Sequence, residues 1–454
     1  MMLPAYPKYK SSDVEWLGEV PRHWVVKRGR FCMDVNPRSQ RLRDLGPDDE
    51  ISFVPMEAIG ECGGLRLEFT RAIADMGSGY TEFEDGDVIV AKITPCFENG
   101  KGALATNLLN RAAYGTTELH VLRAFPTLES RYLFYLTISQ LFRSTGEGEM
   151  YGAGGQKRVP SEFCENFRVP LPSPSEQRTI ADFLDRETAR IDTLMAKEGM
   201  LIARLKEKRT ALISRTVTHG LPPDAARAAG LEPHTKLKPS GIDWLGEVPE
   251  SWTTIQFKRI CRRVDVGIAE AATHAYCDDG VPIIRSTNVK PNRLDLTEVL
   301  RVEPWFAERN RSKKLHAGDL VTVRTGYPGT TAVIPPEFEG SQCFTLVMST
   351  LKSLECPRFF SYFFNAEAGR VFFEMEGWGT AQTNISVPIV QRVPVVHPPP
   401  EEQRAIVDFL DCETAKIDQL LAKVTTAIEC LREYRTTLIT AAVTGTVDLR
   451  GVVA

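Results

Sequence analysis

A long internal repeat sets the limits on how this chain can fold. The string WLGEVP occurs at 16–21 and again 228 residues later, at 244–249, and each copy is soon followed by a second tryptophan. A longer block, EQRTIADFLDRETARID at 176–192, returns 226 residues later as EQRAIVDFLDCETAKID at 402–418, with 13 of 17 positions identical. Solenoid repeats have periods of only about 20–50 residues. Each copy is therefore a domain with a connector, and the chain is a tandem duplication.

Between the repeated blocks the two copies differ almost completely. They share a skeleton such as Gly86-Asp87 against Gly318-Asp319, each followed by a strand-like apolar run. Such runs alternate with amphipathic helical patches, which indicates an α+β (mixed α/β) class for both inserts. We predict five segments: a first globular domain over 1–165, a spacer helix over 175–217, a linker over 218–241, a second globular domain over 242–392 and a C-terminal spacer helix over 401–445.

The connectors carry apolar residues at alternating spacings of three and four, the pattern of a helix that pairs with another helix. The predicted pairing residues are Ile180, Leu184, Ile191, Leu194 and Leu205 in the first copy and Ile406, Leu410, Ile417, Leu420 and Leu431 in the second. Prolines precede each connector, and Gly220 or Gly445 follows it as a C-cap. About 40 residues make a rod of about 60 Å. We expect the two rods to pair antiparallel as a coiled coil with a pseudo-two-fold axis; packing of each rod on its own domain is the alternative.

Composition narrows the class of protein. No run of about 18 apolar residues occurs and the first residues lack a signal-peptide pattern, so we expect a cytoplasmic protein. The ten cysteines show no metal-ligand or disulfide spacing, and we expect no metal site. The net charge of −4 is unfavourable for DNA unless basic residues are clustered, as they are at 27–30, 157–158, 258–263 and 309–314.

The sequence lacks the common motifs of nucleotide-dependent, serine-nucleophile and zinc-dependent enzymes. It has no phosphate-binding G-x-x-x-x-G-K-[ST] loop, no G-x-G-x-x-G turn, no nucleophile elbow and no histidine pair at i, i+4. His120 lies in an apolar strand-like run and is expected to be a hydrogen-bonded core residue. We predict that the chain is not an enzyme.

The repeated helix start, the W-L-G-E-V-P-x-x-W entry and the Gly-Asp strand resemble the specificity subunits of type I restriction-modification systems. Segments of the inserts, Lys92–Lys101 and Arg324–Gly329, also look like target-recognition-domain segments. The resemblance implies that each insert reads one half of a split, asymmetric DNA target. It also implies two methyltransferase subunits and a restriction/translocase subunit as partners. S-adenosylmethionine, ATP and Mg are expected in those partners, with no cofactor bound by this chain.

Base reading in the major groove needs side chains with paired donors and acceptors on loops held by rigid elements. The DNA-binding candidates are Lys92, Thr94, Asn99, Lys101, Lys157 and Arg158 in the first domain and Arg324, Thr325, Tyr327, Gln382 and Asn384 in the second. These positions also fit ordinary strand-end turns. At the level of the whole chain the competing interpretations are a coiled-coil scaffold whose ends bind proteins or glycans, and a concealed nuclease. DNA binding differs from the scaffold in its steep salt dependence.

Overall fold

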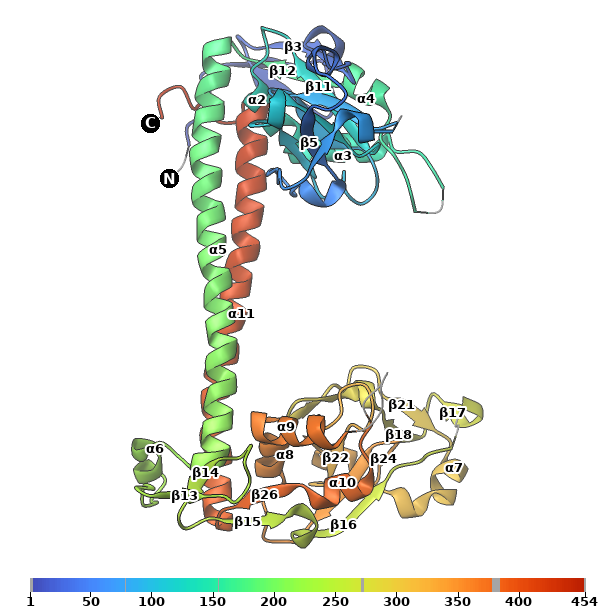
Figure 1. Cartoon of the computed structure of the whole chain (residues 1–454), viewed down its shortest axis with the longest axis vertical. Coiled ribbons are helices and arrows are strands. Elements are labelled where there is room, and N and C mark those ends of the chain that lie inside the picture. The colour runs from blue at the N-terminus through green and yellow to red at the C-terminus, as the bar shows by residue number, and fades with distance from the viewer. Residues whose placement is uncertain (1–2, 78, 154, 271–272, 378–383, 453–454) are drawn as a thin grey trace. The chain divides into compact units, whose positions relative to one another are not determined.

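The computed structural model describes residues 3–77, 79–153, 155–270, 273–377 and 384–452. The chain forms two compact units, one of residues 1–199 with 425–454 and the other of residues 200–424. Each unit consists of a globular head and one end of each of two long helices, α5 (Pro174–His219) and α11 (Pro400–Thr444) (Figure 1). The mixed α+β class and the paired long helices predicted from the repeat are confirmed.

The first head contains two four-stranded sheets and two strand pairs. The first sheet is antiparallel with the order β4-β11-β8-β9, and the second has the order β6-β5-β10-β7 with β5 and β10 parallel. Their bounds are β4 Met33–Val35, β11 Leu119–Ala124, β8 Val88–Ala91, β9 Gly102–Leu104, β6 Thr70–Ala72, β5 Glu50–Val54, β10 Ala112–Gly115 and β7 Thr81–Glu84. The strand pairs join β1 (Tyr9–Ser11) to β2 (Glu19–Pro21) and β3 (Val25–Arg28) to β12 (Arg168–Leu171).

The second head has sheets with the same core pairing. Its antiparallel sheet has the order β16-β25-β22-β23, and its mixed sheet has the order β17-β21-β18-β24 with β18 and β24 parallel. Their bounds are β16 Cys261–Val266, β25 Val347–Leu351, β22 Leu320–Thr322, β23 Thr331–Val333, β17 Tyr276–Cys277, β21 Leu300–Val302, β18 Val281–Ile284 and β24 Gln342–Cys343. The strand pairs join β13 (Leu237–Pro239) to β14 (Glu247–Pro249), β15 (Thr253–Gln256) to β26 (Pro394–His397) and β19 (Val289–Lys290) to β20 (Arg293–Leu294).

Three helices follow the sheets in each head. In the first they are α2 (Ser130–Ile138), α3 (Gln140–Gly148) and α4 (Ser161–Asn166), and in the second α8 (Pro357–Asn365), α9 (Glu367–Glu376) and α10 (Val387–Arg392). The remaining short helices are α1 (Arg41–Asp44), α6 (Pro223–Ala228) and α7 (Pro304–Arg309). The heads therefore keep one plan although their sequences have diverged.

The Gly-Asp skeleton makes the same turn in both heads. Gly86 and Gly318 have φ of 95° and 89°, a region that favours glycine. The next residue is buried, and its carboxylate accepts the backbone N–H three residues before it, at 2.8 Å for Asp87 and 2.9 Å for Asp319. This turn fixes where β8 and β22 begin.

The long helices pair through reciprocal contacts. In the first unit the Arg435 guanidinium lies 3.0 Å from the Asp192 carboxylate, and in the second Arg209 lies 3.0 Å from Asp418. The two aspartates occupy equivalent repeat positions, as do the two arginines. From 192 to 209 along α5 the partner moves back from 435 to 418 along α11, so the pairing is antiparallel. Gly220 and Gly445 end the helices with φ of 83° and 76°, as predicted.

The repeated block attaches each long helix to its head through a buried glutamate. The indole N–H of Trp24 donates to Glu176 at 3.2 Å, and that of Trp252 donates to Glu402 at 2.9 Å. Both tryptophans are fully buried, and the glutamates are only 5% and 8% exposed. The two conserved strings of the repeat are therefore joined to each other in space.

The next residue of the block, a fully buried glutamine, binds the backbone of the head. Gln177 accepts from the N–H of Glu129 at 2.8 Å and donates to the Pro172 carbonyl at 2.9 Å. Gln403 accepts from the N–H of Cys356 at 2.8 Å and donates to the Pro398 carbonyl at 3.0 Å. Each glutamine thus ties the helix start to the chain that precedes it and to the segment that leads into α2 or α8.

A carboxylate nine residues after each glutamate completes the attachment. The Tyr135 hydroxyl donates to Asp185 at 2.7 Å, and the Tyr362 hydroxyl donates to Asp411 at 2.6 Å. An arginine four residues before each tyrosine, Arg131 or Arg358, binds the same aspartate at 2.8 Å. The Trp–Glu, glutamine–backbone, Tyr–Asp and Arg–Asp contacts together form a helix–head joint, and this joint is the same in both copies of the repeat.

The predicted pairing residues divide into buried and exposed sets. The first three of each copy are buried, with Ile191 and Ile417 the most exposed at 5%, and all of them except Ile417 lie in a core shared with head side chains. That core also contains Leu438 and Val443 of α11 in the first unit, so packing on the head and helix pairing occur at one place. Leu205 and Leu431 are half-buried.

Leu194 and Leu420 differ from the prediction, since they are 42% and 48% exposed. After Ile191 the buried face of α5 advances by four residues to Met195, which packs against the first core. A step of one residue turns a helix by about 100°, which carries Leu194 off that face. The same step places Leu421 of the second copy in a half-buried position.

Replacing either buried glutamine with leucine should weaken its own unit. Gln403→Leu leaves the N–H of Cys356 and the Pro398 carbonyl without their partner, and each unsatisfied buried group costs about 1–3 kcal/mol. Hydrogen–deuterium exchange should show faster exchange around α8 for Gln403→Leu and around α2 for Gln177→Leu. The adjacent exposed arginines give matched controls, Arg404→Leu and Arg178→Leu, which should leave exchange unchanged. Equal exchange in the glutamine and arginine variants would contradict the role of the glutamines in attaching each helix to its head.

Candidate nucleic-acid interface

Two loops of the first head meet beside the end of β8. Ile93 pairs with Arg158 as an isolated antiparallel bridge, and the N–H of Thr94 donates to the Lys157 carbonyl at 3.0 Å. The N–H of Val159 donates to the Lys92 carbonyl at 2.8 Å. Four DNA-binding candidates that are far apart in sequence, Lys92, Thr94, Lys157 and Arg158, therefore lie on one pair of loops.

The two basic side chains at 157–158 differ in how strongly they are paired within the head. Arg158 makes two hydrogen bonds of 2.8 and 2.9 Å to Glu118, and these bonds hold the pKa of the Glu118 carboxyl below its usual value. The Lys157 side chain is exposed. Tyr151, whose backbone pairs with Arg158, is 67% exposed. Exposed lysine and tyrosine side chains suit contact with DNA phosphates.

A buried histidine is hydrogen-bonded to the same loop pair. His120 is 4% exposed; its Nε2 donates to the Val159 carbonyl at 2.8 Å, and its Nδ1 accepts from the Asn36 amide at 3.2 Å. Burial lowers the pKa of His120, so the neutral ring is favoured. The prediction of a hydrogen-bonded core histidine is confirmed.

The second head has an equivalent loop pair. Thr325 and Asn384 form an isolated antiparallel bridge, the N–H of Ile385 donates to the Arg324 carbonyl at 3.1 Å, and the Arg324 Nε donates to the Ile385 carbonyl at 3.0 Å. Tyr327 is 83% exposed. The Asn384 side-chain oxygen is buried with no hydrogen-bond partner among the described residues. Gln382 lies outside the described residues.

Two candidates of the first head lie further along the loop after β8. The Asn99 amide donates to Glu61 at 3.1 Å, and the Lys101 ammonium donates to the Met56 carbonyl at 3.2 Å. Both side chains thus hold the chain at 56–61 instead of joining the loop pair at 92–94 and 157–158. Tyr151, in contrast, was missed by the sequence analysis although glycine follows it directly.

The loop after β8 or β22 rests on a helix of its head through one aromatic–glycine contact, with the partners exchanged. In the first head Phe97 of the loop packs on Gly146 of α3, where an added Cβ would meet the ring at 2.3 Å. In the second head Gly329 of the loop packs on Phe373 of α9, and an added Cβ would again meet the ring at 2.3 Å. Gly146 and Phe373 occupy equivalent helix positions. In the first head the loop supplies the ring and the helix the glycine, and in the second head these roles are reversed. Both arrangements give the same spacing between loop and helix.

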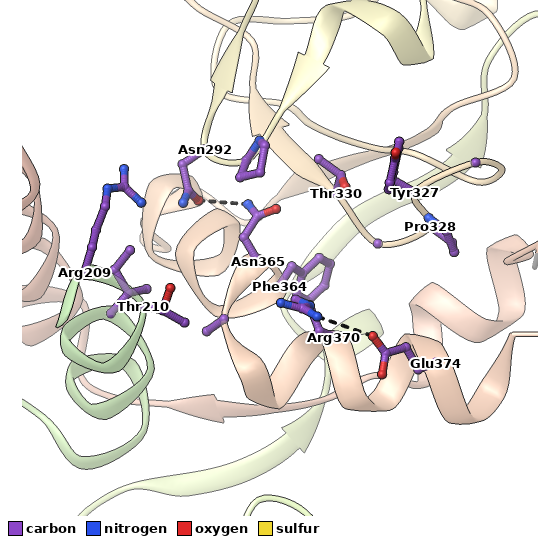
Figure 2. A pocket seen from close by; sticks show the side chains of 15 residues that line it. Arg209, Thr210, Asn292, Tyr327, Pro328, Thr330, Phe364, Asn365, Arg370 and Glu374 are labelled. Atoms are coloured by element: carbon purple, nitrogen blue, oxygen red, sulfur yellow. Dashed lines mark hydrogen bonds and ion pairs between the residues drawn. The ribbon is translucent and has the colours of Figure 1, made fainter. Parts of the chain in front are cut away.

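A pocket of about 500 Å³ lies beside this loop in the second unit. Its wall consists of the turn at 326–330, the end of α8, the first turns of α9, and Arg209 and Thr210 of α5 (Figure 2). Asn365 fixes the wall by donating to Asn292 at 2.9 Å and to the Thr331 carbonyl at 2.7 Å. Tyr327 thus projects from a rigid turn.

Other features of the described residues bear on the class of protein. Within the described ranges no group of three or more His, Cys, Asp or Glu side chains is arranged to hold a metal ion. None of the helices seen there combines the length and hydropathy needed to span a membrane. Part of the basic cluster at 309–314 is used internally, since Lys313 lies 2.8 Å from Asp265 and Arg309 bonds to Glu270.

Comparison with known proteins gives both a family match and a fold match. Residues 79–199 match the family model of the type I restriction modification DNA specificity domain. The specificity subunits of the type I restriction enzymes EcoAI and EcoEI, both from Escherichia coli, are 40% and 38% identical over 176 residues, which is 38% of this chain. The match spans 29% of the length of each relative.

A solved structure extends the fold match to most of the chain. It comes from work on complex assembly and conformational transition of a type I restriction-modification system. The match covers 93% of this chain and 98% of that one, with a TM-score of 0.73 and 16% sequence identity. At that identity the match shows the fold alone, and the family model matches residues 79–199.

Gly329→Ala should destabilise the second head and displace its loop. The substitution adds a Cβ against Phe373 at a φ of 89°, and overpacking costs about 1–3 kcal/mol. Gly326→Ala is the matched control, because Gly326 has a φ of 95° and open space around it. Denaturant unfolding should show a larger loss for Gly329→Ala, and Phe373→Leu should recover part of that difference. Equal losses for the two alanine variants would mean that backbone strain alone matters.

Proposed function

We propose that this chain, which carries a type I restriction modification DNA specificity domain, is the DNA-recognition subunit of a type I restriction-modification complex. Each head binds one half-site of double-stranded DNA, and the full target is bipartite and asymmetric. One observation carries the proposal: the two heads present equivalent loop pairs with different side chains, Lys92 and Arg158 in one and Arg324 and Asn384 in the other. Equivalent geometry with different chemistry suits the reading of two different sequences.

Binding at these loops combines contacts to the DNA backbone, which position the duplex, with contacts that read the bases. Lys157 supplies an exposed cation for a phosphate, and Tyr151 and Tyr327 supply exposed side chains for contact with phosphates or sugars. The Asn384 oxygen is buried and unpaired among the described residues, so a movement of its loop that exposes it to a base amino group would remove the penalty of leaving it unpaired. The amide side chain therefore gains most when the correct base is present.

The long helices are the proposed docking surface for two methyltransferase subunits. Large apolar side chains remain exposed on them, including Leu194 and its repeat equivalent Leu420 and also Tyr434. Matched exposed positions in the two repeats suit two identical partners. The restriction/translocase subunit joins through the methyltransferases. S-adenosylmethionine, ATP and Mg act in those partner subunits, and this chain is non-catalytic.

Exchanging one head should change one half of the target. We expect that replacing residues 253–390 with residues 25–165 of the same chain gives a complex that methylates two inverted copies of the first half-site. Methylome sequencing of the host provides the measurement. The reciprocal exchange, 253–390 in place of 25–165, is the matched control and should give two inverted copies of the other half-site. An unchanged motif, or a single exchange that alters both halves of the motif into new sequences, contradicts the assignment of one half-site to each head.

Lengthening both long helices should change only the spacing between half-sites. Four added residues extend each helix by one turn of about 6 Å, which corresponds to about two base pairs of roughly 3.4 Å each. Inserting them after Gly199 and after Thr425, near the middle of each helix, keeps the joints at both ends intact. The methylated motif should keep both half-sites with a longer gap; a new half-site sequence would show that the helices take part in base reading.

A further inference from the structure

Each unit has a pocket between its head and a long helix that is lined by arginines together with acidic residues, Glu374 in the second unit and Glu61 and Asp192 in the first, and the arginines come from equivalent positions. In the second unit Arg209 and Thr210 of α5 face Arg370 of α9 across the pocket shown in Figure 2. In the first unit Arg435 and Thr436 of α11 and Arg143 of α3 line a pocket of about 610 Å³. Arg143 and Arg370 are both the fourth residue of their helix.

The head arginines keep unused hydrogen-bonding capacity. The Arg143 Nε is buried and has no hydrogen-bond partner among the described residues, while one of its terminal nitrogens donates to the Glu98 carbonyl at 3.0 Å. Arg370 is 65% exposed and its ion pair with Glu374 is long, at 3.6 Å. An exposed pair of this kind contributes little. Both guanidinium groups can therefore take a further acceptor.

The arginines of the long helices already have acidic partners on the other helix. Arg435 and Arg209 are held by Asp192 and Asp418, so they contribute to helix pairing first. In the first pocket Arg432, an exposed residue one turn before Arg435, adds another positive charge. The hydroxyl of Thr210 or Thr436 adds a neutral donor at the same wall.

These pockets adjoin the segments predicted to contact DNA. Tyr327 lines the pocket of the second unit, and Asn99 lines that of the first. The glycine of the loop also sets the distance: Gly329 packs on Phe373, one turn after Arg370, and an added Cβ at Gly100 would lie 3.2 Å from the Arg143 side chain. The arginine is thus placed next to the recognition loop by the same contacts that position the loop.

We infer that Arg143 and Arg370 each hold one phosphate of the DNA backbone beside the half-site that their own head reads. The inference rests on the proposed function and adds a sequence-independent contact to it. Guanidinium groups and hydroxyls are the usual phosphate partners in DNA complexes. The contact fixes the position of the duplex in each head, and the loops then select the bases.

The test measures salt dependence on the full-length chain. The probe is a fluorescent 30-base-pair duplex of arbitrary sequence, titrated by anisotropy between about 50 and 200 mM salt. Each phosphate contact contributes about 0.9 to the slope of log affinity against log salt. Arg143→Gln and Arg370→Gln should each lower the slope by about 0.9, and the double variant by about 1.8. A duplex with the methylated motif should lose affinity by the same factor as the arbitrary duplex.

Matched controls separate this contact from general charge loss. Arg190→Gln removes an arginine that is 80% exposed on α5 outside both pockets, and Glu374→Gln removes the partner of Arg370. Neither control should lower the slope. Thermal unfolding should be unchanged in the Arg370, Arg190 and Glu374 variants, whereas Arg143→Gln also loses its hydrogen bond to the Glu98 carbonyl and is expected to unfold at a slightly lower temperature.

The outcomes distinguish the two proposals. Wild-type slopes in the Arg143 and Arg370 variants overturn the inference while the proposed function stands. Wild-type slopes together with impaired methylation in the assembled complex would assign the pockets to a partner subunit, which also overturns it. Failure of the wild-type chain to bind any duplex at 50 mM salt contradicts DNA recognition by this chain and the inference with it.

Discussion

The buried hydrogen bond between an indole N–H and a glutamate at the start of each long helix is the contact on which the rest of the structure depends. A carboxylate that is 5% or 8% exposed is costly to bury unless it is hydrogen-bonded. Here Trp24 or Trp252 provides one bond, and a histidine provides another, His23 at 2.9 Å or His234 at 2.6 Å. This pairing anchors the first turn of the helix, and the glutamine, Tyr–Asp and Arg–Asp contacts that follow fix its direction relative to the head. The two strings that reveal the duplication are the two sides of this joint.

The sequence was sufficient for the fold wherever repetition or period carried the information. It predicted both long helices, their C-cap glycines and the mixed class of the heads. It did not predict how the buried face turns after Ile191, because Leu194 and Met195 are both apolar and only packing selects Met195. Periodicity defines a stripe but does not resolve a one-residue step within it.

The candidate interface was predicted in part for a similar reason. Ile93 and Arg158 are 65 positions apart (158 − 93), and nothing in either segment indicates that they form a bridge. Residue chemistry selected plausible donors, but it could not separate Lys157, which is exposed, from Lys101, whose ammonium binds a backbone carbonyl. Sharing of charge with neighbours depends on the tertiary structure. The position of Gln382 is outside the described residues, so its assignment stays a prediction.

The exchanged aromatic–glycine contact has a consequence for how such heads can be recombined. The ring and the glycine lie on segments about 45 residues apart, at 97 and 146 or at 329 and 373. A graft of the loop alone from one head to the other would bring two rings, or two glycines, to the same place, giving a clash in one case and a void in the other. The smallest portable piece is therefore the whole stretch from β8 through α3, or from β22 through α9. Exchange between the two heads of this chain therefore has to move a block of that size.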